Sequence, residues 1–216
     1  MSFKGFPPEA FAFYEGLEAD NSKAYWSAHK KVFDSCVAGP MQELLDELEP
    51  AFGVAKMFRP YRDVRFSKDK SPYKTRQYAV VHLGGEHGAS GIQGLYLGID
   101  ADGLHLGGGQ YQASTEQARR MRAAIAEDLT GQELRKVLDA LQRKGFEFGG
   151  EQLKRVPKPW DGAHARADLL RYKSLTAHFH HPVDALLNSP KVKAEVASRW
   201  KAMAPLNSWM AAHAGG

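Results

Sequence analysis

The sequence predicts an α+β fold, in which a central antiparallel meander sheet of four or more strands is flanked by N-terminal and C-terminal helices. Apolar residues with helical spacing fill the first fifty positions and return after residue 111. Between them, from about residue 57 to residue 107, apolar and polar residues alternate as in strands. The order helices, strands, helices, without a repeat or a linker, predicts a single α+β domain over residues 1–216.

Three amphipathic helices are predicted before residue 57. Pro7 and Pro8 suit the start of the first, Asn21 or Ser22 can cap the second, and Pro40 opens the third. Each helix has one apolar stripe: Ala10, Phe13, Tyr14 and Leu17 in the first, Trp26, Phe33 and Val37 in the second, and Met41, Leu44, Leu45 and Leu48 in the third.

Four strands are predicted over Met57–Phe66, Arg76–Leu83, Gln93–Ile99 and Leu104–Gly107. The link at residues 100–103 ends in the turn dipeptide Asp-Gly, and the glycine-rich residues 84–91 suit another hairpin loop. Connections this short are antiparallel, because parallel strands need a crossover of about a dozen residues.

Helices are predicted again in the C-terminal half. Ser114 with Gln117, and Thr130 with Glu133, have the spacing of capping boxes. Residues 146–155 suit a small hairpin. A long helix is expected to begin near residues 189–190 and to be interrupted by Pro205.

Composition excludes several classes of protein. The chain has 216 residues, 43% of them hydrophobic, which is typical of a globular protein. Its one cysteine excludes a disulfide framework and four-cysteine metal sites. No stretch is long enough for a membrane span and none looks like a signal peptide, so we expect a cytoplasmic protein without a membrane partner. Neither a cofactor nor a metal is indicated by any motif, and the oligomeric state stays open.

The positive net charge of +4 is concentrated in two segments. Residues 59–76 hold seven basic and two acidic side chains, and residues 154–173 hold six basic and two acidic ones. The rest of the chain carries 16 basic and 21 acidic groups, so its net charge is negative. This pattern does not fit a uniformly basic coat for non-specific binding to duplex nucleic acid.

The first basic segment is the predicted ligand site. Arg62 falls on an otherwise apolar face of the predicted strand and needs an acceptor or an anion there. A nine-residue connection with three lysines follows, and long loops are often functional. We therefore predict a small anionic ligand, bearing phosphate, sulfate or carboxylate, and leave open whether the protein is an enzyme. The predicted ligand-binding residues are Arg62, Asp63, Arg65, Ser67, Lys68, Lys70, Tyr73 and Lys74. A possible second segment comprises Lys154, Arg155, Lys158, Arg171 and Lys173.

Two other interpretations stay open for the same segment. In a nucleic-acid module, Tyr61, Tyr73 or Tyr78 would stack on bases. In an interaction or structural domain, Asp63 and Asp69 would pair with the neighbouring arginines.

Several segments resemble one known family. Residues 62–75, with the sequence RDVRFSKDKSPYKT, are similar to the signature of the domain of unknown function 2461 family. Similarity to the same family, in the same order along the chain, is also found at residues 20–26, 95–99, 107–111, 153–160 and 169–174. Asp20 stands where the family more often has asparagine, and Pro159 where glycine is commoner. The resemblance implies one domain and brings no activity, cofactor or catalytic residue.

Other clusters give weaker signals. The three glycines at 107–109 favour a close backbone approach over a phosphate cradle. His178, His180 and His181 favour surface histidines over a metal site. The acid–base candidates near the basic loop in sequence are Asp63, Asp69, Glu86 and the histidines, and no catalytic residue can be named.

Overall fold

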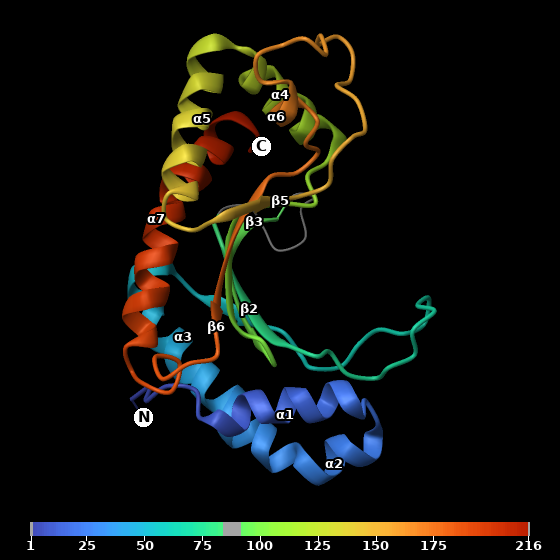
Figure 1. The fold of residues 1–216 in the computed structure, drawn as a ribbon, viewed down its shortest axis with the longest axis vertical. Helices are drawn as coiled ribbons and strands as arrows, with labels where there is room; N and C mark the ends of the chain where they lie inside the picture. The colour runs from blue at the N-terminus through green and yellow to red at the C-terminus, as the bar shows by residue number, and fades with distance from the viewer. Residues whose placement is uncertain (1, 84–91, 216) are drawn as a thin grey trace. The chain divides into compact units, whose positions relative to one another are not determined.

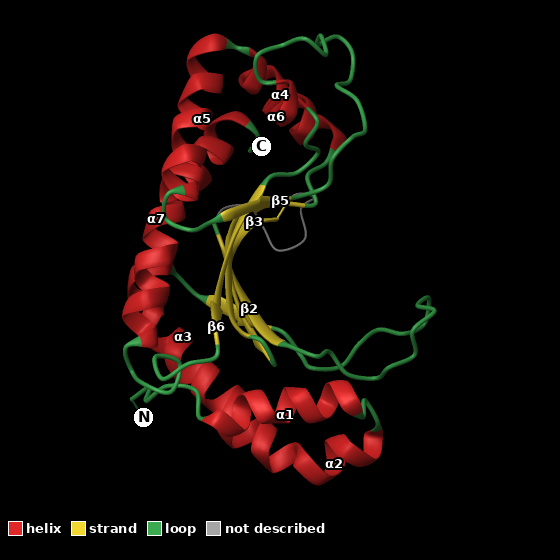
Figure 2. Cartoon of the chain, viewed as in Figure 1, coloured by secondary structure: helices red, strands yellow, loops and turns green. Residues whose placement is uncertain are grey.

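The α+β class is confirmed by a computed structural model, which describes residues 2–83 and 92–215. Its antiparallel sheet has six strands in the order β1-β2-β3-β4-β6-β5, and helices precede and follow them in the chain (Figures 1 and 2). The glycine-rich segment 84–91, which includes Glu86, lies outside the described residues. No helix among the described residues is long and apolar enough to cross a membrane.

The chain divides into two compact units, each assembled from three stretches. Unit 1 comprises Met1–Val81, Tyr96–Leu106 and His180–Ser198, and unit 2 comprises His82–Leu95, Gly107–Phe179 and Arg199–Gly216. Each unit is described by itself below. The single-domain organisation of residues 1–216 stays a prediction.

The helices of unit 1 begin where the sequence predicts. Helix α1 spans Pro8–Ala19, and α2 spans Lys23–Val32 with the Ser22 side chain accepting the N–H of Tyr25. Pro40 lies at the start of the third helix, as predicted, but no gap separates this helix from the second. A π-helical segment, η1 (Phe33–Ala38), runs directly into α3 (Gly39–Phe52). Pro40 has no N–H to donate to the carbonyl four residues back, and a wider turn at this point accommodates that loss.

The predicted strand Met57–Phe66 is wrong in its extent. Strand β1 covers Ala55–Met57 and pairs with β2 (Gln77–His82), with Met57 opposite Ala79. Residues 58–76 form a long connection, drawn as loop in Figure 2, in which Tyr61 and Tyr73 make an isolated bridge. Pro60 cannot donate to a ladder, and the Asp63 and Asp69 side chains accept the backbone N–H groups of Arg65 and Ser71 instead.

The third and fourth predicted strands are confirmed as a hairpin. Strand β3 spans Ile92–Asp100 and β4 spans Gly103–Tyr111, joined by a two-residue turn. Strand β4 runs four residues further than predicted and includes the three glycines. Alternate residues of unit 1's strands, among them Ala79, Leu97 and Leu106, are buried and form part of its core.

The glycine at 109 allows a close approach between segments of unit 2. Its φ is +111°, and a Cβ there would lie 2.5 Å from the carbonyl oxygen of Leu175. Its N–H donates to Asn207 Oδ1 at 2.9 Å. The glycine run therefore serves a close backbone approach, as the sequence favours.

Gly109→Ala is expected to lower the free energy of unfolding by about 1–3 kcal/mol, because alanine at this φ is strained and would overlap the carbonyl. Urea denaturation followed by circular dichroism measures the change. At Gly162 a Cβ would meet no atom within 4 Å, so Gly162→Ala is the matched control and is expected to stay within about 0.5 kcal/mol of wild type. Equal stabilities for the two variants would contradict the prediction.

Unit 2 contains two helices with different caps. Helix α4 (Thr115–Ala126) has the predicted capping box between Ser114 and Gln117. Helix α5 (Asp128–Gln142) starts two residues before the predicted cap, and the capping box at Thr130 is wrong. The Glu127 carboxylate instead accepts the N–H groups of Leu129 and Thr130.

The C-terminal strands and helices correct two further predictions. Strand β5 (Glu147–Gly149) pairs with β6 (Thr176–Pro182), so the hairpin predicted within residues 146–155 is wrong. His178 and His180 lie on one face of β6 and His181 on the other, and together they hide the apolar alternation of this strand. After the short helix α6 (Ala167–Leu170), helix α7 covers Val192–His213 without ending at Pro205. Pro205 lies on an exposed side, and its missing N–H affects one hydrogen bond of a long helix.

Candidate functional site

The long connection between β1 and β2 is anchored to the helices of unit 1 at Tyr73. The Asn21 amide donates to the carbonyl of Tyr73 at 3.1 Å and accepts its N–H at 3.1 Å. The ring of Trp26 stacks on the Tyr73 ring with centroids 4.3 Å apart and an interplanar angle of 7°. Asn21 directly precedes the cap of α2, so the start of this helix holds the base of the loop.

The loop is also held by its own charges. The Asp69 carboxylate accepts the N–H and the hydroxyl of Ser71 at 2.9 and 2.6 Å, and it pairs with Arg62. These hydrogen bonds, those from Ser71 first, lower the pKa of Asp69 far below its ordinary value. The Arg65 guanidinium binds the Asp63 carboxylate through two nitrogens, at 3.0 and 2.7 Å, which lowers the pKa of Asp63. A loop with these internal bonds has a defined conformation.

A hollow of about 270 Å³ lies beside this loop in unit 1, and we call it the basic hollow. Its lining residues are Arg62, Tyr73, Lys74, Thr75, Arg76 and Tyr78. Three of them are cationic and none of these described lining residues is acidic. The basic hollow therefore has a positive lining that suits an anion.

Lys74 and Arg76 are positioned by neighbouring polar groups. The ammonium of Lys74 donates to the carbonyl of Arg59 at 2.8 Å and lies 4.8 Å from the ring centroid of Tyr78. Arg76 is hydrogen-bonded to Tyr96 of β3. Neither contact neutralises the cation, because carbonyl, ring and hydroxyl carry no full negative charge.

The structure brings part of the predicted site together. Arg62, Tyr73 and Lys74 line the basic hollow. The other predicted residues of this segment belong to the loop outside that lining: Asp63, Arg65, Ser67, Lys68 and Lys70. Lys70 donates to the carbonyl of Val64 at 2.9 Å and so helps to shape the loop.

Sequence reasoning missed Thr75, Arg76 and Tyr78 as members of the site. Arg76 directly precedes β2 and Tyr78 is the second residue of this strand, so their side chains, two positions apart, lie on one face of the sheet. Lys74 and Arg76 are also two positions apart. Extending the alternating pattern of the predicted strand back to Lys74 could therefore have predicted that the two side chains lie next to each other. Asn21 could have been found through the motif that it shares with Trp26.

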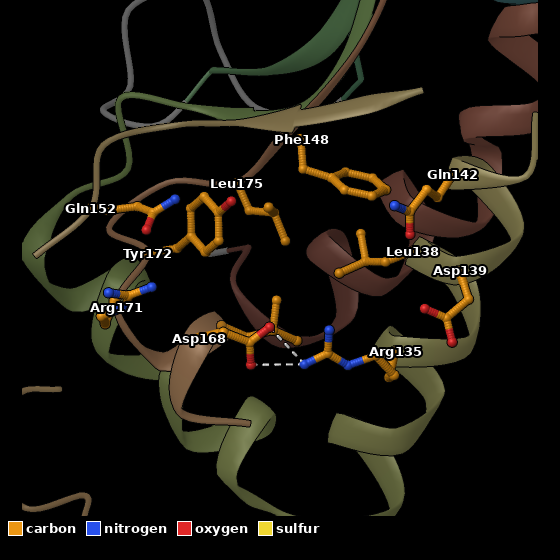
Figure 3. A pocket seen from close by; sticks show the side chains of 11 residues that line it. Arg135, Leu138, Asp139, Gln142, Phe148, Gln152, Asp168, Arg171, Tyr172 and Leu175 are labelled. Carbon is orange, nitrogen blue, oxygen red and sulfur yellow. Dashed lines mark hydrogen bonds and ion pairs between the residues drawn. The ribbon is translucent and has the colours of Figure 1, made fainter. Parts of the chain in front are cut away.

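The second basic segment belongs to unit 2 and is divided among several roles. Lys154, Arg155 and Lys158 are exposed, and Lys173 pairs with Glu151. Arg171 lines a separate hollow of about 160 Å³ within unit 2 (Figure 3). In that hollow Arg135 binds both oxygens of Asp168 at 2.8 Å, and Asp139 also lines it. The negative charges of Asp139 and Asp168 offset the positive charges of Arg135 and Arg171. This hollow therefore lacks the net positive charge that an anion would need.

The histidine cluster lies on a strand. Within β6, the ring of His178 is 2.7 Å from the Thr176 hydroxyl, and burial lowers the pKa of His178. His181 contacts Asp184 at 3.1 Å. Within residues 2–83 and 92–215, no group of three or more His, Cys, Asp or Glu side chains is arranged to hold a metal ion.

Comparison with known proteins gives one result. The sequence model of a family described as "Conserved hypothetical protein (DUF2461)" matches residues 9–209. No curated protein matches the chain. The matched range includes Asn21 and Trp26 as well as every residue of the basic hollow. Because it covers nearly the whole sequence, the chain belongs to the DUF2461 family.

Proposed function

We propose that the protein binds a small anionic ligand in the basic hollow. The observation that carries this proposal is a lining with three cations, Arg62, Lys74 and Arg76, and no acidic residue among its described members. Guanidinium forks and an ammonium group make strong charge-assisted hydrogen bonds to phosphate, sulfate or carboxylate oxygens. Thr75 and the two tyrosines add hydroxyl groups to the same lining.

Pairing with carboxylates of the same loop accounts for only some of the arginines in residues 59–76. A purely structural role would pair each arginine with a carboxylate through two bonds, and Arg65 fits this description. Arg62 reaches Asp69 through one nitrogen, and Arg76 bonds to a tyrosine. As far as residues 2–83 and 92–215 are concerned, both therefore keep N–H groups for a ligand. This difference favours anion binding over a structural domain.

Nucleic-acid binding fits the tyrosines less well. Tyr73 is 6% exposed and stacked on Trp26, so its faces are not open to a base. Tyr78 stacks on Phe58 with centroids 4.7 Å apart. Tyr61 is the more exposed ring, at 46%. Of these three tyrosines only Tyr61 is open to stack on a base, so the set of stacking tyrosines that this function needs is incomplete.

Thermal unfolding in the presence of inorganic phosphate, sulfate and citrate tests the proposal. An anion at about 100 times its dissociation constant is expected to stabilise the fold by about 2.7 kcal/mol. For a chain of this size that raises Tm by roughly 5–10 °C. Arg76→Gln and Lys74→Gln are each expected to weaken binding about tenfold or more, because each removes a charge-assisted hydrogen bond.

Lys154→Gln is the matched control, since it removes one exposed cation of unit 2 and leaves the basic hollow intact. Stabilisation by none of the three anions would refute the proposal. An equal loss of binding in Lys154→Gln would show a general charge effect instead of a site.

A further inference from the structure

The basic hollow adjoins a polar face of the sheet in unit 1. Arg76 bonds to Tyr96, whose side chain lies forward along β3 over Gly98. A Cβ at Gly98 would overlap the hydroxyl oxygen of Tyr96. Glycine at this position therefore allows the Tyr96 hydroxyl to lie flat on the sheet.

His105 lies next to this hydroxyl, across the hairpin. The two-residue turn between β3 and β4 places Asp100 opposite Gly103, so Gly98 is opposite His105. Cβ positions of directly opposed residues are about 4.5–5.5 Å apart. The Tyr96 hydroxyl, which covers the Gly98 position, is therefore a close neighbour of the His105 side chain.

Asp100 orients the His105 ring. Its Oδ1 lies 2.8 Å from Nε2 of His105 and also accepts the N–H of Asp102 at 3.0 Å. Asp100 is 8% exposed, whereas the side chain of His105 is 31% exposed. Burial raises the pKa of Asp100, but its hydrogen bond to His105 and the charges of His105 and Arg76 leave that pKa below the ordinary value. Asp100 is thus an anion that holds the proton on Nε2.

Geometry assigns the tautomer of the neutral ring. Since Nε2 carries the hydrogen donated to Asp100, Nδ1 keeps its lone pair and acts as an acceptor. His180 stacks on this ring with centroids 4.7 Å apart. The titratable or charged groups around the pair come from several elements of unit 1: Tyr14 of α1, Arg76 and Tyr78 at β2, Tyr96 of β3, Asp102 of the turn and His180 of β6.

We propose that His105 completes the site and selects a phosphate group, so that the ligand is inorganic phosphate or a phosphate monoester. This inference rests on the anion-binding function of the basic hollow. A phosphate monoanion carries an O–H that can donate to Nδ1, whereas sulfate and carboxylate anions have no hydrogen to donate. With sulfate bound, the lone pair of Nδ1 would face the lone pairs of an anionic oxygen. Nδ1 would then have no hydrogen-bond donor, and the contact would be repulsive.

Proton sharing explains the role of Asp100. When the phosphate O–H bond breaks, the proton forms an N–H bond with Nδ1 and the oxygen keeps the electron pair. The second pKa of a phosphate monoester is about 6, so near neutral pH its last proton is available to a neutral imidazole nitrogen. The Asp100 carboxylate stabilises the imidazolium that results.

Competition between phosphate and sulfate tests the inference by isothermal titration calorimetry on the full chain. At pH 7.5 we expect wild type to bind phosphate about tenfold or more tighter than sulfate. His105→Gln should lose the preference at pH 7.5, and His29→Gln, on α2, is the control that should keep it.

The outcomes separate the two proposals. Equal affinities at pH 7.5, or a preference that survives in His105→Gln, would overturn the role of His105 and leave anion binding intact. Binding of neither anion would overturn both. If His105→Gln does not fold, the histidine ring signals of wild type decide: phosphate is expected to shift the NMR titration of His105 but not that of His29, and an unchanged His105 titration would refute the inference.

Discussion

Trp26→Ala is expected to lower the free energy of unfolding by about 3–5 kcal/mol, the usual cost of removing a large buried aromatic side chain. Trp26 is 4% exposed. Its ring centroid lies 5.7 Å from that of Phe13, 4.8 Å from that of Phe33 and 4.3 Å from that of Tyr73. The cavity would open at the junction of α1, η1 and the base of the loop. Urea denaturation followed by circular dichroism measures the loss.

The same substitution is expected to weaken anion binding, because Tyr73 lines the basic hollow and loses its stacking partner. Trp26→Phe keeps an aromatic ring and should recover most of the stability. Trp160 is half-buried in a loop of unit 2, so Trp160→Ala is the control and should cost less. The expected effect is refuted if Trp26→Ala and Trp160→Ala are equally stable, or if anion affinity in Trp26→Ala equals that of wild type at a temperature where both are folded.

Arg166→Ala is the second large expected effect, a loss of about 2–4 kcal/mol in the free energy of unfolding, since several buried hydrogen bonds are lost together. Arg166 is 7% exposed. Its Nε donates to the carbonyl of Ile125 at 2.7 Å, and its Nη2 donates to the carbonyls of Ala126 at 3.1 Å and Glu127 at 3.3 Å. These carbonyls end α4, where a cation is also favoured by the helix dipole. Alanine would leave carbonyls without donors, at about 1–3 kcal/mol for each that stays buried.

Two variants isolate this effect. Arg166→Lys keeps the charge but cannot reproduce the fork, so it should be intermediate in stability. Arg155→Ala removes an exposed arginine of the same basic segment and should change stability by less than about 0.5 kcal/mol. Chemical denaturation of the three proteins compares them. If Arg166→Ala were as stable as Arg155→Ala, the capping role would be wrong.

The helices could be predicted from the sequence, whereas the conformation of the first basic segment could not, because the physical signals in the two parts of the sequence differ. The apolar stripes of α1, α2 and α3 identify these helices because tertiary packing buries one face of each. Residues 57–66 also alternate, yet most of them form a loop. Pro60 cannot join a ladder, and pairs such as Arg65–Asp63 form within the segment. Phe66, predicted on a strand face, is 95% exposed.

Residues of the site can be predicted from the sequence only where basic residues are concentrated. Arg62 and Lys74 follow from the concentration of cations, whereas Arg166 contributes to the same charge and is a structural cap. The alternation of apolar and polar residues after Arg76 predicts a strand but gives no sign of a ligand site. The contact between Asp100 and His105 depends on a two-residue turn that brings positions five apart onto one face. Sequence spacing shows that pair only after the register of the hairpin is known.

Unit 1 has a consequence for the order in which the protein is made on the ribosome. Its final stretch, His180–Ser198, supplies Lys193, which pairs with Glu47 at 2.9 Å, and Leu187, whose carbonyl accepts the N–H of Phe6 at 2.7 Å. At about 5–20 residues per second, translation from Leu106 to Ser198 takes roughly 5–20 s. During that time the N-terminal segment that contains α1–α3 lacks these two contacts. The nascent chain also has no stacked His105–His180 pair until the ribosome has passed residue 180.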